Sequence, residues 1–366
     1  MPWKNRFTGD VTVDSFAFII HAMEVGDIKK RIKPLRYLPD SWVERLASRR
    51  KPFVLSHVNG VRSQFNGKKI KGWFVGLPMT SRALITYPPD FVAEKIRQCG
   101  RLAQEQGAQV MGLGAFTSVA GDGGITAREG LDIALTTGNS YTVATALEAL
   151  RIACQKMDID LEEESVAVVG ATGSIGKACA LILSRQGKNI RLVGRDPEKT
   201  QQVLKEIRKI SGNRISAHTD VEEGIRGARA IITVTSAVES IVKPDWIEQK
   251  AVVCDVSRPR NIAEEVVRVR RDVLVIEGGV VDVPGDPDFG MDFGYPPGKS
   301  YACMAETMAL VLEERYENFT LGKEVKVEKV EEIERIASKH GFRVSGLRGF
   351  GKELTDEEIE KIRKAR

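Results

Sequence analysis

Three glycines spaced three residues apart, Gly170, Gly173 and Gly176, directly follow the apolar run Val166–Val169. This pattern predicts a buried strand, a tight turn and a helix that begins near Ser174. Gly170 permits the turn, Gly173 lets the backbone approach a phosphate, and Gly176 lets the helix lie close to the strand. A helix N-terminus offers unpaired N–H groups and partial positive charge, so we expect the pyrophosphate of a dinucleotide here. The candidate cofactor-binding residues of this turn are Gly170, Thr172, Gly173, Ser174, Ile175 and Gly176.

A second predicted strand, Asn189–Val193, is followed by Gly194 and Arg195, and Arg195 comes nineteen residues after Gly176. This is about the distance at which dinucleotide-binding domains place the residue that reads the ribose. Enzymes that use NAD usually have a carboxylate there, whereas arginine attracts a 2′-phosphate. We therefore predict NADPH as the cofactor, and the alternative is an ordinary strand–helix turn with a solvated arginine.

Predicted strands and helices alternate after residue 100, which indicates an α/β fold with a parallel sheet. The prediction is a Rossmann-type doubly wound sheet with a separate N-terminal α/β substrate domain. Its ranges are 1–135 for the substrate domain, 136–300 for the NADP-binding domain, and 301–366 for C-terminal helices that pack back, with a charged tail. Ligands bind beyond the carboxyl ends of such strands. Further cofactor-binding candidates at these ends are therefore Thr235, Ser236, Gly278 and Gly279.

Cys303 lies in the first turn of a predicted helix that begins near Ser300, after a loop rich in glycine and proline. The helix dipole and the unpaired N–H groups favour its thiolate, which is a strong nucleophile. A small buried residue on an alanine-rich face is the alternative. The five cysteines are scattered and form no Cys-x-x-Cys pair, which argues against disulfides and zinc.

The remaining polar patterns favour structural roles. We expect His21 and His57 to be hydrogen-bonded structural residues, and His218 and His340 to lie on the surface. No Gly-x-Ser-x-Gly motif supports serine hydrolase chemistry, and no metal site is predicted. A helix is predicted from Tyr141 to about Lys156, with Asn139 or Ser140 as its N-cap, and Thr355 is predicted to cap the last helix.

With 366 residues and a net charge of +5, the chain has the composition of a globular protein. It has no apolar run long enough to span a membrane and no basic leader, so a cytoplasmic protein is expected. The first 100 residues carry an excess of ten basic over acidic residues. This charge suggests an acidic partner, although no nucleic-acid-binding signature accompanies it.

Several sequence blocks together resemble the long-chain acyl-[acyl-carrier-protein] reductases, which form fatty aldehydes. The matching blocks are Phe16–His21, Gly114–Ser118, Thr136–Asn139, Val166–Gly173, Gly278–Val281, Ala302–Glu306 and Lys339–Phe342. The resemblance implies that Cys303 takes the acyl group from a thioester of acyl-carrier protein or CoA, and that NADPH reduces it to an aldehyde. Substrate-binding candidates within these blocks are Phe116, Thr117, Ser118 and Asn139.

Tyr141 takes a place where that family carries a histidine, so it is a candidate proton donor, with packing inside the helix as the alternative. Two other functions fit the same sequence. One is an NADP oxidoreductase of the shikimate or quinate dehydrogenase type acting on a small polar alcohol, which predicts a polar pocket with a lysine and aspartate pair. The other is a noncatalytic regulator that binds NADP or lipid.

Overall fold

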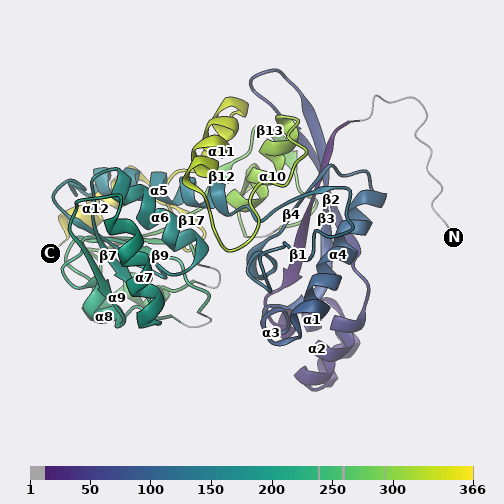
Figure 1. The fold of residues 1–366 in the computed structure, drawn as a ribbon, viewed down its shortest axis with the longest axis horizontal. Coiled ribbons are helices and arrows are strands. Elements are labelled where there is room, and N and C mark those ends of the chain that lie inside the picture. The colour runs from purple at the N-terminus through teal and green to yellow at the C-terminus, as the bar shows by residue number, and fades with distance from the viewer. Residues whose placement is uncertain (1–12, 238–239, 258–259, 293, 366) are drawn as a thin grey trace.

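The computed structural model describes residues 13–237, 240–257, 260–292 and 294–365, and they form two α/β halves (Figure 1). The C-terminal half contains a sheet of six parallel strands in the order β11-β10-β9-β6-β7-β8. These strands are β6 (Ser165–Val169), β7 (Asn189–Val193), β8 (Ile215–His218), β9 (Ala230–Thr233), β10 (Val252–Asp255) and β11 (Leu274–Glu277). This is the Rossmann strand order, so the predicted fold class is confirmed.

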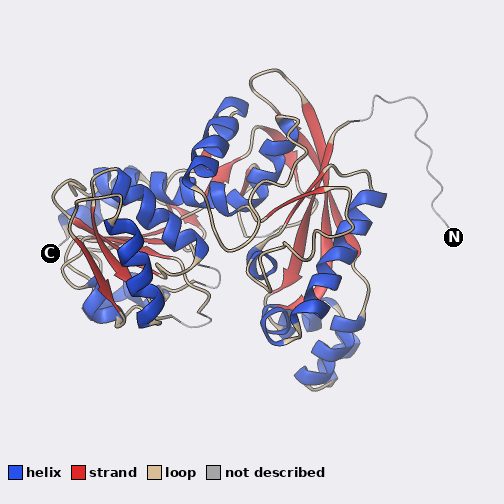
Figure 2. Ribbon diagram, viewed as in Figure 1, coloured by secondary structure: helices blue, strands red, loops and turns tan. Residues whose placement is uncertain are grey.

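Helices cover both faces of this sheet, which explains why its strands read as continuous apolar runs (Figure 2). The central strand β6 pairs Val166 with Ile190 on one side and with Ala230 on the other. The surrounding helices are α5 (Asn139–Lys156), α6 (Ser174–Arg185), α7 (Pro197–Arg208), α8 (Val221–Ile225) and α9 (Glu264–Val269), with the short 3-10 helix η3 (Pro244–Trp246).

The N-terminal half is built on a mixed six-stranded sheet in the order β13-β2-β3-β1-β4-β5. Its strands are β1 (Ser15–Ala22), β2 (Phe53–Arg62), β3 (Lys69–Thr80), β4 (Val110–Gly112), β5 (Ala134–Thr136) and β13 (Gly285–Asp288). Its helices are α1 (Val25–Arg31), η1 (Lys33–Tyr37), α2 (Asp40–Arg49), α3 (Ser81–Thr86), α4 (Pro89–Glu105) and η2 (Ala115–Ser118). The central strand β1 runs parallel to both β3 and β4, so the ends of β1 and β4 meet at one edge of the sheet.

The C-terminal segments pack on both halves of the molecule. Helix α10 (Ala302–Leu312) contacts α5 and α11 (Val327–His340) and also strands β1, β3 and β4. Helix α12 (Asp356–Lys364) instead contacts β11 in the C-terminal half.

The remaining strands are β12 (Val280–Asp282), β14 (Lys299–Tyr301), β15 (Arg343–Val344), β16 (Arg348–Gly349) and β17 (Lys352–Glu353). The domain boundaries remain a prediction, and β13 pairs with the N-terminal sheet although it lies before residue 300.

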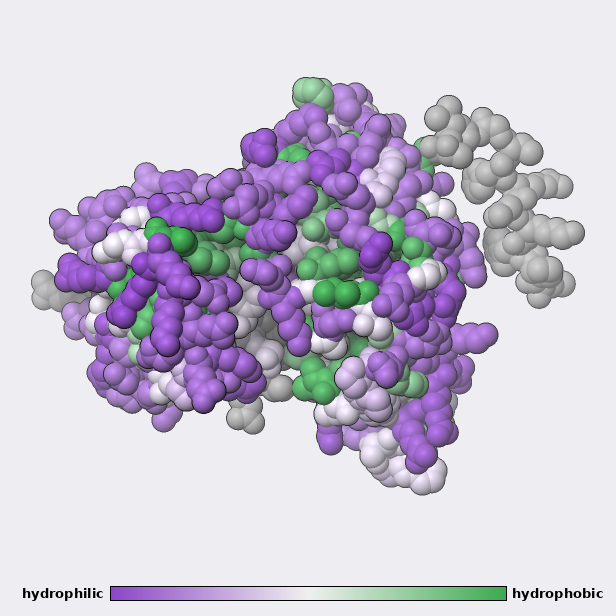
Figure 3. Space-filling view, in the orientation of Figure 1, coloured by the Kyte–Doolittle hydropathy of each residue, from purple (hydrophilic) through white to green (hydrophobic). Residues whose placement is uncertain are grey.

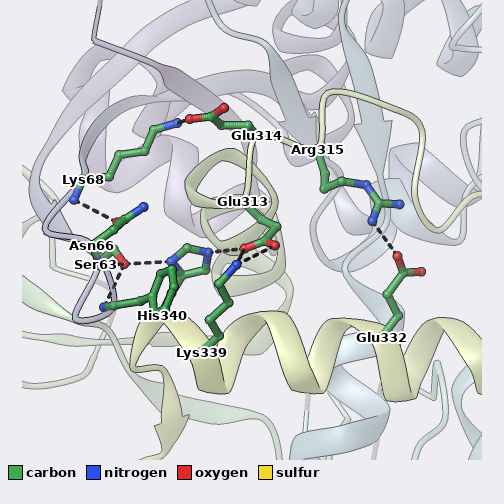
Figure 4. Close-up of polar contacts among 10 residues, drawn as sticks. Ser63, Asn66, Lys68, Glu313, Glu314, Arg315, Glu332, Lys339 and His340 are labelled. Carbon is green, nitrogen blue, oxygen red and sulfur yellow. Dashed lines mark hydrogen bonds and ion pairs between the residues drawn. The ribbon is translucent and has the colours of Figure 1, made fainter.

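Two histidine predictions were wrong, because His340 is buried and the side chain of His218 is largely covered. Nδ1 of His340 lies 2.8 Å from Oγ of Ser63, and its Nε2 lies 2.8 Å from Oε2 of Glu313 (Figure 4). The sequence of contacts from serine through histidine to glutamate is that of a hydrolase triad. Ser63 is buried, however, and its Oγ accepts the backbone N–H of Phe65, so it is not placed to attack a substrate. The cluster therefore fastens the turn between β2 and β3 to the end of α11.

The cap of α5 also differs from the prediction. The helix begins at Asn139, and its N-cap is Gly138 rather than Asn139 or Ser140. Gly138 has φ of +76°, a left-handed conformation that other residues adopt with strain. The predicted cap of α12 is confirmed, because Thr355 accepts the backbone N–H of Glu358. Within the described residues, no helix is both long and apolar enough to cross a bilayer.

Candidate active site between the two halves

A cavity of about 870 Å³ lies between the two halves, and the space-filling view shows hydrophobic surface on the N-terminal side of this hollow (Figure 3). One wall comes from the ends of the parallel strands and from the glycine turn. The opposite wall is largely apolar and comes from β1 and η2. The residues from the nucleotide-binding side include Gly173, Ser174, Ile175, Val234, Thr235, Ser236, Gly278 and Gly279. Those from the N-terminal half include Phe18, Ile19, Ile20, His21, Phe116, Ser118 and Val119.

The glycine turn has the shape that a pyrophosphate requires. Gly170 has φ of +92°, and a Cβ there would lie 2.3 Å from the carbonyl oxygen of Val234. A Cβ on Gly176 would lie 2.3 Å from the carbonyl oxygen of Gly170, whereas one on Gly173 would have no atom nearer than 3.4 Å. No side chain caps α6, whose N-cap is Gly173. The first N–H groups of this helix therefore suit a phosphate that faces Gly173.

The other predicted cofactor-binding residues surround this turn without lining the cavity. Arg195 is exposed, two residues after the end of β7. Thr172 lies beside Gly194, where an added Cβ would come within 2.9 Å of its Cγ2. Gly170 and Gly176 form the tight part of the turn itself. Arg195 therefore stays a predicted contact of the ribose phosphate, because Rossmann domains place the residue that reads the ribose after the second strand.

Cys303 is the cysteine that reaches the cavity. It is the second residue of α10 and the one residue of that helix that is not buried. The other cysteines lie in the core, where burial raises the pKa of Cys154 and of Cys179 to about 12. Such thiols are inert, whereas a thiol in the first turn of a helix is favoured as thiolate.

The turn before α5 lies directly against Cys303. A Cβ on Gly138 would come within 2.3 Å of Cβ of Cys303, so only glycine fits at this contact. The next residue, Asn139, lines the cavity and reaches the glycine turn, with its Nδ2 3.4 Å from Oγ of Ser174. The start of α5 therefore joins the candidate nucleophile to the nucleotide turn.

Two predicted site residues face away from the cavity. Tyr141 is buried with its side chain in the main hydrophobic core, and the residues of this helix turn that line the cavity are Asn139 and Thr142. Burial is the main cause that raises the pKa of its phenol far above the usual value. Thr117 is also fully buried, and its hydroxyl donates to the carbonyl oxygen of Gly114 at 2.7 Å.

Four residues at or near the cavity were not predicted from the sequence as site residues. His21 lines it, and its Nε2 accepts the backbone N–H of Phe116 at 3.3 Å. Arg260 and Phe350 also line it, stacked with 5.3 Å between the guanidinium carbon and the ring centroid. Glu306, the fourth, is fully buried one helical turn after Cys303. Glu306 is the one charged residue in the apolar run 302–312, and this exception in the sequence could have indicated a role for it.

The environment of Glu306 has two opposing effects on its ionisation. Burial raises the pKa of this carboxyl group to about 7, although hydrogen bonds from Thr136 and from the backbone N–H of Tyr141 favour the charged form. Oε2 of Glu306 accepts the N–H of Tyr141 at 2.8 Å. The carboxyl group therefore changes its charge near neutral pH.

Comparison with known proteins identifies relatives of both halves. Residues 151–277 match the family described as shikimate / quinate 5-dehydrogenase. The chain is 28% identical over 358 residues to the aminotransferase PigE of a Serratia species, covering 95% of this chain but only 42% of PigE. It is also 28% identical over 297 residues to the long-chain acyl-[acyl-carrier-protein] reductase of Synechococcus elongatus, covering 77% of this chain and 83% of that protein. Among solved structures, the malic enzyme of Entamoeba histolytica aligns with 95% of the chain at 13% identity and a TM-score of 0.41.

The parallel sheet, the glycine turn and the family match over 151–277 agree with one another. The chain has the NAD(P)-binding domain of an oxidoreductase. The prediction of a nicotinamide dinucleotide cofactor is thereby confirmed, and the exposed Arg195 favours NADPH.

The cofactor site predicts a sharp difference between two glycine substitutions. Gly176→Ala would force the turn open at Gly170, so we expect the Kd for NADPH to rise roughly ten- to a hundredfold, which corresponds to about 1–3 kcal/mol. Gly212→Ala is the matched control, because an added Cβ there meets no atom within 4 Å. Fluorescence titration with NADPH measures both, and equal Kd values for the two variants would contradict this account of the turn.

The buried carboxyl group predicts a dependence of stability on pH. The pKa of Glu306 in the folded protein is about 7, above the usual 4.5 of a glutamate, so its contribution to stability is present at low pH and is lost as pH rises from about 4.5 to 7. Glu306→Gln cannot ionise. The free energy of unfolding of the variant, relative to that of the natural protein, should therefore increase by about 1–3 kcal/mol as the pH rises from 5 to 8. Calorimetric melting at both pH values checks this, and a constant difference in melting temperature would refute it.

Proposed function

We propose that this protein reduces a long-chain acyl thioester to a fatty aldehyde with NADPH, through an acyl group held on Cys303. The single observation that carries the proposal is the position of Cys303 in one cavity between the nucleotide turn and an apolar wall. The similarity to the acyl-[acyl-carrier-protein] reductase of Synechococcus elongatus supports the same reaction.

In the first step, the thiolate of Cys303 attacks the carbonyl carbon of the thioester. A bond forms between Sγ and this carbon, the bond from the carbon to the donor sulfur breaks, and the donor leaves as a thiol after taking up a proton. The N-terminus of α10 favours both the thiolate and the negative charge that develops on the carbonyl oxygen. Cys303 then carries the acyl group as a new thioester.

In the second step, the acyl group on Cys303 is reduced. NADPH, when bound at the glycine turn, supplies the hydride that takes the acyl carbon to the aldehyde level. Cleavage of the bond between Sγ of Cys303 and that carbon then releases the aldehyde and restores the thiolate. Asn139, whose amide lies 3.4 Å from Ser174, keeps the two parts of the site together during both steps.

The apolar wall suits the hydrocarbon chain of the substrate. Phe18, Ile19, Ile20, Phe116 and Val119 line the side of the cavity formed by the N-terminal half. Burial of methylene groups against such residues contributes about 0.8 kcal/mol each. The same residues keep water from the acyl group on Cys303, which would otherwise hydrolyse to the fatty acid. Phe116, Ser118 and Asn139 are therefore proposed to contact the substrate, whereas Thr117 holds the backbone of η2.

The donor is proposed to be acyl-carrier protein or CoA, both of which carry negative charge. Helix α1 begins two residues after Met23, which lines the cavity, and α1, α2 and the segment between them carry exposed basic residues. These are Lys30, Arg31, Lys33, Arg36, Arg45 and Arg49. Their charge would attract either donor and speed its encounter with the protein.

A second candidate is an NADP oxidoreductase that acts on a small polar alcohol, because the match over residues 151–277 is to shikimate and quinate dehydrogenases. That reaction uses no nucleophilic cysteine and needs a polar pocket. The apolar residues of β1 and η2 beside Cys303 favour the thioester reductase instead. Activity retained in Cys303→Ser would favour the polar-alcohol enzyme.

Acylation of Cys303 is the decisive prediction. Incubation with a long-chain acyl-CoA or acyl-carrier protein, without NADPH, should add the mass of one acyl group, and peptide mapping should locate it on Cys303. Cys303→Ala should form neither adduct nor aldehyde. Cys99→Ala, which alters a buried cysteine of α4, is the control and should retain both. No adduct and no aldehyde from either donor would refute the proposal, and NADPH binding without turnover would favour a regulator.

Arg195 predicts the choice of cofactor. Arg195→Asp removes the positive charge that binds the 2′-phosphate, so the Kd for NADPH should rise roughly ten- to a hundredfold. The Kd for NADH, which lacks this phosphate, should change little. Arg335→Asp, an equal change of charge at an exposed site on α11, is the control. If Arg195→Asp weakens both cofactors equally, Arg195 does not read the phosphate.

A further inference from the structure

Glu306 is an exception within its helix. Ten of the eleven residues of α10 are buried, and Glu306 is the charged one among them. Its carboxyl group is fully buried, one helical turn after Cys303. A buried carboxyl group costs free energy unless its oxygens accept hydrogen bonds, so its partners indicate why it is there.

Those partners belong almost entirely to the turn that leads into α5. Oε2 accepts the backbone N–H of Tyr141 at 2.8 Å, and Oε1 accepts the hydroxyl of Thr136. The backbone of Gly138 and the side chain of Thr320 also lower the pKa of the carboxyl group. Glu306 therefore binds both ends of the segment 136–141 from a different helix.

This arrangement replaces the missing cap of α5. Gly138, the N-cap, has no side chain that could accept the first N–H groups of the helix. The carboxyl group of Glu306 accepts one of them instead, and its negative charge suits the positive end of the helix dipole. The backbone and hydroxyl partners all donate hydrogen bonds to Glu306. A side chain that offers only donors therefore could not replace Glu306.

The segment that Glu306 holds is the one in contact with Cys303. Gly138 packs so closely on Cys303 that an added Cβ would lie 2.4 Å from its Cα and 2.8 Å from its carbonyl oxygen. Asn139 follows and faces Ser174 of the glycine turn. A shift of this segment would therefore change the surface that packs against Cys303 and so the position of its thiol group.

We infer that Glu306 is a positioning residue for Cys303, which acts by clamping the turn at 136–141 against the start of α10. Glu306 does not touch the substrate in this account. The inference extends the proposed function, because it assigns a role in the reactivity of the thiol group that the proposal makes the nucleophile.

The test compares Glu306→Ala with Glu306→Gln and reads the reactivity of Cys303 itself. Iodoacetamide alkylates cysteine without any acyl donor, and peptide mass mapping gives the rate at Cys303. We expect Glu306→Ala to slow alkylation at least about tenfold, since a misplaced reacting group loses rate steeply. Glu306→Gln keeps an oxygen for Tyr141 and an amide that can donate to Thr136, so it should stay within about threefold of the natural protein.

Two further variants keep the test decisive. Thr136→Val removes the donor to Oε1 without altering α10, and it should also slow alkylation, which covers the case that Glu306→Ala fails to fold. Asp272→Asn changes a buried carboxylate that pairs with Arg270 in the other half, and it should leave the rate unchanged. The Kd for NADPH should stay within about twofold in Asp272→Asn, because the partners of Asp272 are not those of the glycine turn.

The outcomes separate this inference from the proposed function. Alkylation at the natural rate, or faster, in both Glu306→Ala and Thr136→Val would overturn the positioning role even if aldehyde is formed. Equal slowing in Asp272→Asn would also overturn it. If the variants behave as expected but no acyl thioester is reduced, the positioning role stands and the proposed function fails.

Discussion

The backbone contact between Gly138 and Cys303 is the constraint on which the site depends. It brings the starts of α5 and α10 together at a distance that only a glycine permits. Helix α5 belongs to the nucleotide-binding half, whereas α10 packs on the N-terminal sheet as well. One close approach therefore places the cysteine beside the nucleotide turn and opposite the apolar wall. The left-handed conformation of Gly138 costs little because glycine adopts it freely.

The two halves contribute different physical properties to the cavity. The nucleotide side offers backbone N–H groups and small polar side chains, which suit phosphate and ribose. The side formed by β1 and η2 offers aromatic and branched apolar side chains, which suit hydrocarbon. Cys303 and Asn139 lie where these surfaces meet. A reaction between a charged cofactor and an apolar chain needs such a division, because neither surface alone could bind both.

Much of the nucleotide-binding half could be predicted from sequence, because its signals are local. The run Val166–Val169, the three glycines and the strand before Arg195 are consecutive in the chain and depend on short-range sterics. Cys303 could also be placed in the first turn of a helix from its neighbours. The predictions for His340 and for the cap of α5 were wrong, and the candidate role of Tyr141 lost support. Each of the three depends on which face a helix turns to a distant segment.

The sequence by itself determined the fold class, the cofactor turn and the presence of a cysteine at a helix start, since each follows from the conformational preferences of neighbouring residues. Only the tertiary structure decided which residues surround that cysteine and line its cavity. Gly138, Asn139, Glu306, His21 and Phe350 come from distant parts of the chain and converge through packing. The physical reason is that burial and hydrogen bonding act between residues close in space, whatever their separation in sequence.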